Sequence, residues 1–386
     1  MTKVSELWDQ ARQIDPTLKM SRKQFAELAR RRLMPTRYSR DLVFSAMAAG
    51  RPVVVSDLAV PVRGEHELGA RTAVFEALRD GFPKSHRFAI RLGRSGQQRV
   101  RLRADELMRR WINPRTRVSI PDLHIRGSEL YRAIDCTTLS DFNLLAGAPS
   151  PIGEEEMLTM VVSSAGIFTD SHSDAPDGSN HCFVGRKLWL VWDTFEGLAR
   201  NLEDVERSGT DRDQAAFDIA AFLAIPGARW FTVEDGQTLF LPGHLTHKVI
   251  TLEDYLGVGS FFVMLPSYLR TLLRWSEHTP LWALTLPAAR RMELVDQITR
   301  RVTRKVNALA RQPEAQQIHW GLPHLVAAVA AWQSMAPAKQ RALLLDNPAS
   351  ARLLDAVGAL QGQVPNPAVR PRASRRALPR DQVLVA

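Results

Sequence analysis

The sequence is poor in cysteine, with Cys136 and Cys182 as its only two in 386 residues. Two cysteines are too few for a disulfide framework or for a Cys-rich structural zinc site. The first residues, MTKVSELWDQARQIDP, lack the apolar segment of a secretory signal peptide, and no apolar run is long enough to span a bilayer. These absences predict a soluble protein of the reducing cytoplasm that has no membrane partner.

Acidic residues are outnumbered, with 41 Asp and Glu against 51 Lys and Arg and a formal net charge of +10. The excess lies near the start of the chain, in residues 91–117, and in a C-terminal tail rich in proline and arginine. Such a surface favours acidic partners, nucleic acid among them. No helix-turn-helix, zinc-finger or RNA-binding aromatic motif accompanies the charge, so a solvated basic face is the simpler interpretation and nucleic acid remains an alternative.

The hydrophobic pattern predicts a mainly β protein with helical additions, in four parts. These are N-terminal helices in 1–45, a β domain in 46–270 with its core at 155–265, a helical region in 271–362, and a disordered tail in 363–386. Predicted strands cover 51–60, 86–93, 98–104, 156–166, 181–195, 228–235, 237–243, 247–252 and 257–265. Predicted helices cover 4–14, 21–33, 70–82, 104–112, an insert at 201–225, 287–312, 322–335, 336–346 and 347–361. Many short strands suggest a barrel or sandwich, and the C-terminal helices could cap its core or bury a homodimer interface.

The hexapeptide TDSHSD at 169–174 follows an apolar run and carries the strongest chemical signal. His172 and Asp174 are two residues apart, so on a strand their side chains point the same way. His247, in LFLPGHLTHKV, lies between two predicted strands and is the best third ligand. His244 is its rival, but the spacing from Pro242 favours His247 and a place for His244 at the mouth of the site. Two histidines and a carboxylate on one face of an octahedron form the facial triad of non-haem Fe(II) oxygenases. The plainer alternative for His172 and Asp174 is a surface loop with a capping carboxylate.

Lys187 lies among apolar strand residues in VGRKLWLVW, where burial without an anionic partner would be costly. A carboxylate of the co-substrate 2-oxoglutarate would supply that partner, and the hydroxyl of Thr169 could donate to the same carboxylate. Strand alternation would place Trp189 on the same inward face as Lys187. Structural or packing roles are expected for Asp170, His181 and Cys182.

Residues 155–265 resemble the JmjC family of cupin-fold Fe(II)/2-oxoglutarate oxygenases. FTDSHSD is similar to the family's Phe-Thr-Asp-x-His-x-Asp block, GRKLWLVW to its Gly-x-Lys-x-aromatic strand, and DGQTLFLPGHLTHKVITLEDYLGVGSFFV to its closing strands. The resemblance implies a double-stranded β-helix of the jelly-roll or cupin type. It also implies Fe(II) bound by His172, Asp174 and His247, and 2-oxoglutarate bound by Lys187 and Thr169, with Asn180 as a further contact.

The sequence departs from the family's pattern at two places, with Leu245 where a Trp is usual and Phe261-Phe262 where Asn-Phe is frequent. No chromatin-reading zinc module fits two cysteines. We therefore expect hydroxylation of a protein or peptide side chain or a small metabolite, with release of succinate and CO2, rather than demethylation of N-methyl-lysine. The alternatives are a metal-dependent cupin of another reaction class and a non-catalytic cupin-like protein that binds through its basic surface.

Overall fold

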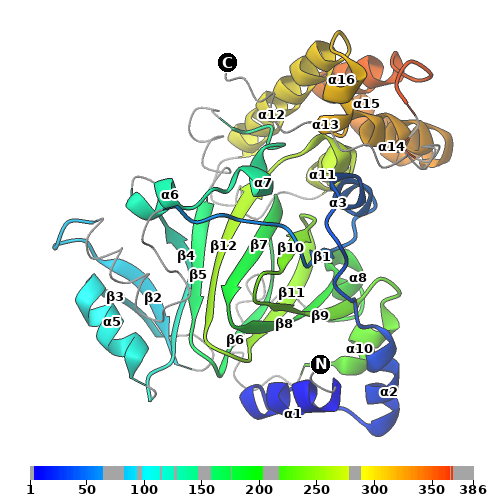
Figure 1. Ribbon diagram of the computed structural model, residues 1–386. Coiled ribbons are helices and arrows are strands. Elements are labelled where there is room, and N and C mark those ends of the chain that lie inside the picture. The colour runs from blue at the N-terminus through cyan, green and yellow to red at the C-terminus, as the bar shows by residue number, and fades with distance from the viewer. Residues whose placement is uncertain are drawn as a thin grey trace.

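The computed structural model describes residues 4–63, 82–93, 98–113, 115–125, 128–146, 158–174, 176–202, 217–277, 288–365 and 367. Within these ranges the protein is mixed α and β, with two antiparallel sheets flanked by helices (Figure 1). Helices α1 (Val4–Ile14) and α2 (Arg22–Arg30) lie at one end of the sheets, and the helices from α12 (Ala288–Leu309) to α16 (Pro348–Gly358) cluster at the other end (Figure 1). Strands flanked by N-terminal and C-terminal helices are present as expected, but the protein is mixed α and β rather than mainly β.

The larger sheet has eight strands in the order β1-β10-β7-β12-β5-β4-β2-β3. Their bounds are β1 Val53–Val55, β2 Phe88–Leu92, β3 Gln98–Leu102, β4 Val118–His124, β5 Leu158–Ser163, β7 Asp177–Val184, β10 Thr238–Leu241 and β12 Tyr255–Phe262. The smaller sheet has the order β6-β11-β8-β9. Its strands are β6 Ile167–Ser173, β8 Arg186–Asp193, β9 Arg229–Glu234 and β11 Leu245–Thr251.

Strand β8 shows how side-chain alternation builds the layers. Leu188, Leu190 and Trp192 are buried together with Trp8 of helix α1 in a core on the outer side of the smaller sheet. Trp189, one residue out of phase, is buried in a separate core between the sheets. A strand with both faces buried must be apolar almost throughout, as the sequence LWLVW is.

The helices fall into three groups along the chain. The N-terminal helices are α1 Val4–Ile14, α2 Arg22–Arg30 and α3 Arg40–Ala48. Between or beside strands lie α5 Ala104–Ile112, α6 Glu129–Ala133, α7 Thr137–Ser140, α8 Thr194–Leu198 and α10 Ile219–Ala224. The C-terminal group is α11 Leu265–Glu277, α12 Ala288–Leu309, α13 Glu314–His319, α14 Leu322–Met335, α15 Ala338–Leu345 and α16 Pro348–Gly358, and it forms a core of its own.

Local sequence signals account for many of these elements. Ser21 caps α2, and its hydroxyl accepts from the backbone N–H of Gln24 while the Gln24 side chain accepts from the Ser21 N–H. The predicted helices at 4–14, 104–112 and 322–335 have the bounds of α1, α5 and α14.

Other expectations needed correction. The predicted strand 51–60 is only the three residues of β1, and 181–195 is two strands that part at Gly185. Gly185 has φ +98°, and a Cβ there would lie 2.0 Å from the carbonyl oxygen of Asp254, so the turn requires glycine. Strand β4 was not predicted. The predicted helix 70–82 and the tail from 368 lie outside the described residues, as does 203–216 of the insert.

In the described part of the chain, every helix is too short or too polar to cross a membrane.

Candidate metal centre

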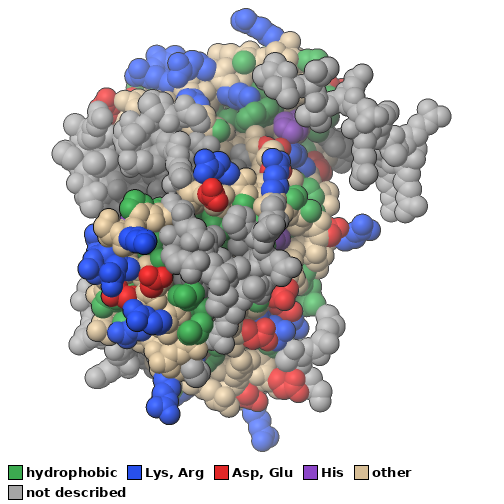
Figure 2. All heavy atoms as spheres, turned by 60° about the vertical axis from the view of Figure 1, so that its left-hand side comes forward, with side chains coloured by type: hydrophobic (Ala, Val, Ile, Leu, Met, Phe, Trp, Pro, Cys, Tyr) green, Lys and Arg blue, Asp and Glu red, His purple; other side chains and the backbone are tan. Residues whose placement is uncertain are grey.

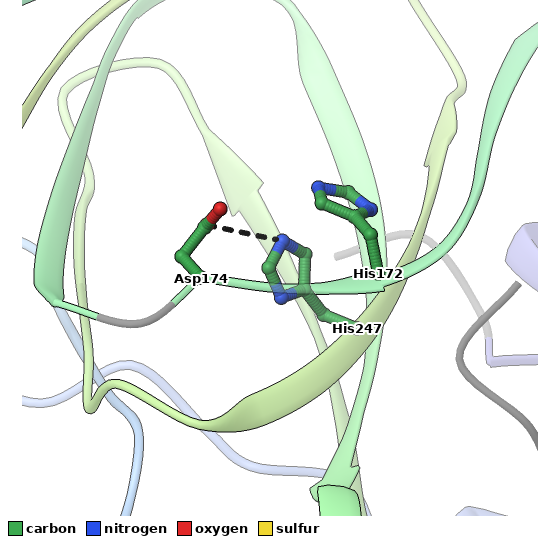
Figure 3. A group of neighbouring side chains, drawn as sticks. All are labelled: His172, Asp174 and His247. Atoms are coloured by element: carbon green, nitrogen blue, oxygen red, sulfur yellow. Dashed lines mark ion pairs between the residues drawn. The ribbon is translucent and has the colours of Figure 1, made fainter. Parts of the chain in front are cut away.

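Strands β6 and β11 of the smaller sheet bring His172, Asp174 and His247 together. His172 and His247 are directly opposite each other in the antiparallel register, and their ring centroids are 4.1 Å apart. Asp174 follows the last residue of β6. One ligand atom from each of the three residues lies within 4.8 Å of the others, as a shared metal ion requires (Figure 3).

Hydrogen bonds to the backbone orient both imidazole rings. His172 Nδ1 lies 2.8 Å from the carbonyl oxygen of Asp170, and His247 Nδ1 lies 3.1 Å from that of Leu245. A carbonyl oxygen can only accept, so each Nδ1 carries a proton and Nε2 is the ring nitrogen left to bind a metal. A backbone acceptor that fixes the tautomer in this way is the usual support of a metal-binding histidine.

His247 is neutral in this environment. Burial, followed by the nearby His172, holds its pKa well below the ordinary value. Its Nε2 lies 3.8 Å from Asp174 Oδ2, the contact drawn as a dashed line in Figure 3. Because the ring is neutral and the separation is too long for a hydrogen bond, we interpret this contact as two lone-pair donors facing one point rather than as a salt bridge.

A buried charge cluster lies behind the two ligand strands. Lys248, next to His247 but on the opposite face of β11, places its Nζ 3.1 Å from Asp170 Oδ1 and 2.9 Å from Asp15 Oδ2. Asp15, just beyond α1, is fully buried. The contact with Asp15 lacks hydrogen-bond alignment, so it is ionic rather than directional. Asp170 therefore has the structural role expected of it, because it lies on β6 and binds Lys248 of β11.

A cavity of about 220 Å³ lies against the three candidate ligands. Lys187, Thr169 and Asn180 all line it, so the three residues predicted to hold a co-substrate share one space with the triad. Trp189 lines the same cavity, on the inward face of β8 with Lys187, as strand alternation predicts. Lys187 is 5% exposed, so its ammonium group is held away from bulk water.

Tyr255 is a fully buried residue that contacts two residues of the cavity lining, and the sequence did not indicate it. Its ring lies under the Lys187 ammonium, with Nζ 4.4 Å from the ring centroid, and its hydroxyl donates to Asn180 Oδ1. Burial raises its pKa well above the ordinary value, so the hydroxyl keeps its proton and remains a donor. With Oδ1 of Asn180 occupied, the amide NH2 of that residue is the group left to face a ligand.

Several other sequence expectations can be compared with the structure. His244 is buried but is absent from both the triad and the cavity lining, so it neither competes with His247 nor lies at a cavity mouth. It has φ +59°, and its backbone N–H donates to the carbonyl of Asp174 at 2.7 Å. Leu245 is buried in the core between the sheets, and Phe261 lines the cavity.

His181 and Cys182 are packing residues, as expected. His181 Nδ1 is 2.8 Å from Thr238 Oγ1, and burial lowers its pKa to about 4. Cys182 is buried, and its thiol donates to the carbonyl of Gly185.

Neither a scan against protein-family models nor a search of curated proteins finds a match for this chain.

Proposed function

We propose that this protein is an Fe(II)- and 2-oxoglutarate-dependent dioxygenase that hydroxylates a C–H bond and releases succinate and CO2. The observation that carries the proposal is the convergence of His172, Asp174 and His247 in one cavity with Lys187. Two imidazole nitrogens and one carboxylate are the donor set of non-haem Fe(II) oxygenases, and they leave coordination positions for a chelating keto acid and O2.

The strand order supports a double-stranded β-helix of the JmjC or cupin type. Strands β5, β7, β10 and β12 belong to the larger sheet, whereas β6, β8, β9 and β11 form the smaller one. The chain therefore crosses repeatedly between two four-stranded groups that enclose the cavity, with ligands at the end of β6 and on β11. Strands β1 to β4 extend the larger sheet beyond this unit.

The residues predicted to hold the metal and the co-substrate have separate roles in this proposal. His172, Asp174 and His247 would hold Fe(II), and Lys187 would pair with the distal carboxylate of 2-oxoglutarate while Thr169 donates its hydroxyl to that group. When bound, the metal and keto acid supply the oxidation: O2 gives one oxygen atom to succinate as CO2 leaves, and the other to the substrate C–H bond. The protein orients the reactants and excludes water.

Tyr255 supports two of these contacts. Its hydroxyl donates to Asn180 Oδ1, which leaves the Asn180 amide NH2 to donate to the co-substrate, and its ring flanks Lys187.

The charges on the cavity wall favour hydroxylation over removal of methyl groups from lysine. Among the described lining residues, Asp174 is the one carboxylate, and it belongs to the metal triad. Lys187 and Arg91 are cations. A cationic methyl-lysine would therefore meet no carboxylate free to pair with it on these walls, whereas an anionic keto acid is well matched.

Other expectations remain predictions. Met335, Leu343 and Leu345 are exposed on α14 and α15, and such side chains are compatible with a homodimer through the C-terminal helices. The cytoplasmic location is proposed on the sequence alone.

Anaerobic titration with Fe(II) and then 2-oxoglutarate tests the proposal directly. We expect a visible charge-transfer band that requires both additions, and succinate release once O2 and a substrate are supplied. His172→Ala should abolish the band. Lys187→Ala should keep metal binding but weaken 2-oxoglutarate binding about 10- to 100-fold, because one charge-assisted pair is lost.

Lys339→Ala is the matched control, since Lys339 is exposed on α15 and the same charge is removed. Metal binding without any 2-oxoglutarate binding would indicate a cupin of another reaction class. Binding of both without succinate release, with every substrate class tried, would favour a non-catalytic binding protein.

A further inference from the structure

The strand register shows that residues of β2 and β3 lie on the same face of the larger sheet as residues that line the cavity. Ser163, on the same face of β5 as the cavity residues Thr159 and Val161, is directly opposite Ser119 of β4. Ser119 is opposite Arg91 of β2, and Arg91 is opposite Arg99 of β3. Directly opposite residues project to the same face of a sheet.

Arg91, Arg99 and Arg101, two residues further along β3, therefore form a row that continues the cavity-facing side of the larger sheet. We call these three residues the arginine strip. Arg91 is half-buried and lines the cavity itself, whereas Arg99 and Arg101 are exposed. The strip thus leads from solvent to the mouth of the proposed active site.

The strip places like charges side by side. Arg91 and Arg99 are a direct cross-strand pair, an arrangement that destabilises a sheet unless an anion lies between them. Among the described residues, no ion pair involves any of the three arginines. Such a repulsive arrangement is relieved when a negatively charged ligand binds.

The residues around the arginine strip add to its positive charge. Residues 82–93, 98–113 and 115–117 contain ten Lys and Arg but only two acidic residues, Asp105 and Glu106. Glu106 is already paired with Arg103. Figure 2 brings this side of the molecule forward, and several Lys and Arg side chains gather there with few carboxylates between them. The ten are Lys84, Arg87, Arg91, Arg99, Arg101, Arg103, Arg109, Arg110, Arg115 and Arg117.

The volume of the cavity limits how much of a substrate can enter it. Its 220 Å³ is below the roughly 300–1,000 Å³ of small-molecule pockets, and the co-substrate would take part of it. The remaining space suits one side chain of a larger molecule. Within the described residues of β2 and β3, the arginines share this side only with Ala89, so these two strands offer the bases of a nucleic acid no aromatic side chain to stack on.

Resting on the proposed function, we infer that the arginine strip docks an acidic peptide segment of a protein substrate. Arg91 pairs with a carboxylate beside the residue that enters the cavity, and Arg99 and Arg101 pair with carboxylates further along the segment. Extended peptides place alternate side chains on one side, as β3 places Arg99 and Arg101, so an acidic residue at every second position matches the strip.

Binding of labelled peptides to the full-length chain tests this inference without turnover. Fluorescence anisotropy would compare a peptide of alternating Glu and Ala with its Lys/Ala counterpart and with a single-stranded RNA of equal charge. We expect the Glu/Ala peptide to bind best, and Arg99→Glu/Arg101→Glu to weaken its binding about tenfold or more at low salt. Arg91→Gln should weaken it less, by about threefold to tenfold.

Arg109→Glu/Arg110→Glu is the matched control, because it makes the same charge change in the same basic region but on exposed positions of α5 that do not belong to the strip. An equal loss in this control would mean a diffuse basic surface and would overturn the inference, as would tighter binding of the RNA through the same arginines. A protein that binds the peptide through the strip but never releases succinate would keep this inference and reject the proposed oxygenase. Succinate release without any added substrate, from a protein that does not bind the peptide, would keep the proposed oxygenase and reject this inference.

Discussion

Lys248 is the residue at which a single substitution should most clearly reveal how the metal centre is supported. Its ammonium group lies between the carboxylates of Asp15 and Asp170, and its side chain is 5% exposed. Asp15 is 0% exposed, and its other oxygen, Oδ1, accepts from the backbone N–H and hydroxyl of Thr17. Lys248→Met keeps the length and apolar stem of the side chain but leaves the buried carboxylate of Asp15 without its cation.

Removing one partner of a buried ion pair costs about 3–5 kcal/mol, because the remaining charge is left desolvated. A domain of ordinary stability has about 5–15 kcal/mol in total, so Lys248→Met should remove about a fifth of it or more. Asp15→Asn in the same chain removes the stranded charge while Asn keeps an acceptor for Thr17. The double variant should therefore be more stable than Lys248→Met alone by about 1–3 kcal/mol.

Equilibrium unfolding of the metal-free protein in urea, followed by circular dichroism and tryptophan fluorescence, would measure all four members of this double-mutant cycle. The reasoning fails if Lys248→Met lowers the free energy of unfolding by less than about 1 kcal/mol, or if the two substitutions simply add. Either result would mean that Asp15 is hydrated in solution and that the cluster contributes little.

Two further predictions concern stability. Gly185→Ala should destabilise the protein by about 3 kcal/mol or more, since a Cβ would meet the Asp254 carbonyl at 2.0 Å in a left-handed turn. Gly236→Ala is also at positive φ, but its added Cβ would have nothing within 4 Å, so it should lower the free energy of unfolding by only about 1 kcal/mol. Thermal unfolding of both variants would measure this, and equal losses would refute the steric argument. The pKa of His181, lowered from 6.5 to about 4, means that the unfolded chain takes up a proton before the folded one as pH falls. Metal-free protein should therefore lose up to about 3 kcal/mol between pH 6.5 and 4 from this group, and His181→Gln should flatten that part of the curve; an unchanged slope would assign the acid sensitivity elsewhere.

The elements that the sequence predicted well are those whose own residues determine them. Helix α1 has a regular apolar stripe and α2 a complete capping box, and both are found where those signals place them. Strand β4 was missed because Pro121 and Asp122 fall within it, and both residue types are unfavourable in strands. Its pairing with β5 shifts register between Ile120 and Leu123, so tertiary contacts hold a segment that local propensity does not favour.

The residues of the candidate site also differ in whether the local sequence indicates them. His172 and Asp174 lie in a short motif, and Lys187 stands out among apolar neighbours, so each leaves a local signal. Tyr255 and Arg91 leave none, since only pairing with distant strands brings an ordinary strand tyrosine beside Lys187 and one arginine among many to the cavity wall. Long-range register is information that composition and spacing do not contain.

Strand β11 meets two opposite demands with adjacent residues. His247 faces the cavity and presents Nε2 to the metal position, while Lys248 faces outward and binds the carboxylates of Asp15 and Asp170. The Asp170 carbonyl in turn fixes the ring of His172, so the N-terminal helix, the outer charge cluster and both imidazoles are mechanically connected. A substitution at Asp15, which does not line the cavity, should therefore weaken metal binding as well as stability. That coupling would be absent if the ligand strands were held in register by their backbone hydrogen bonds alone.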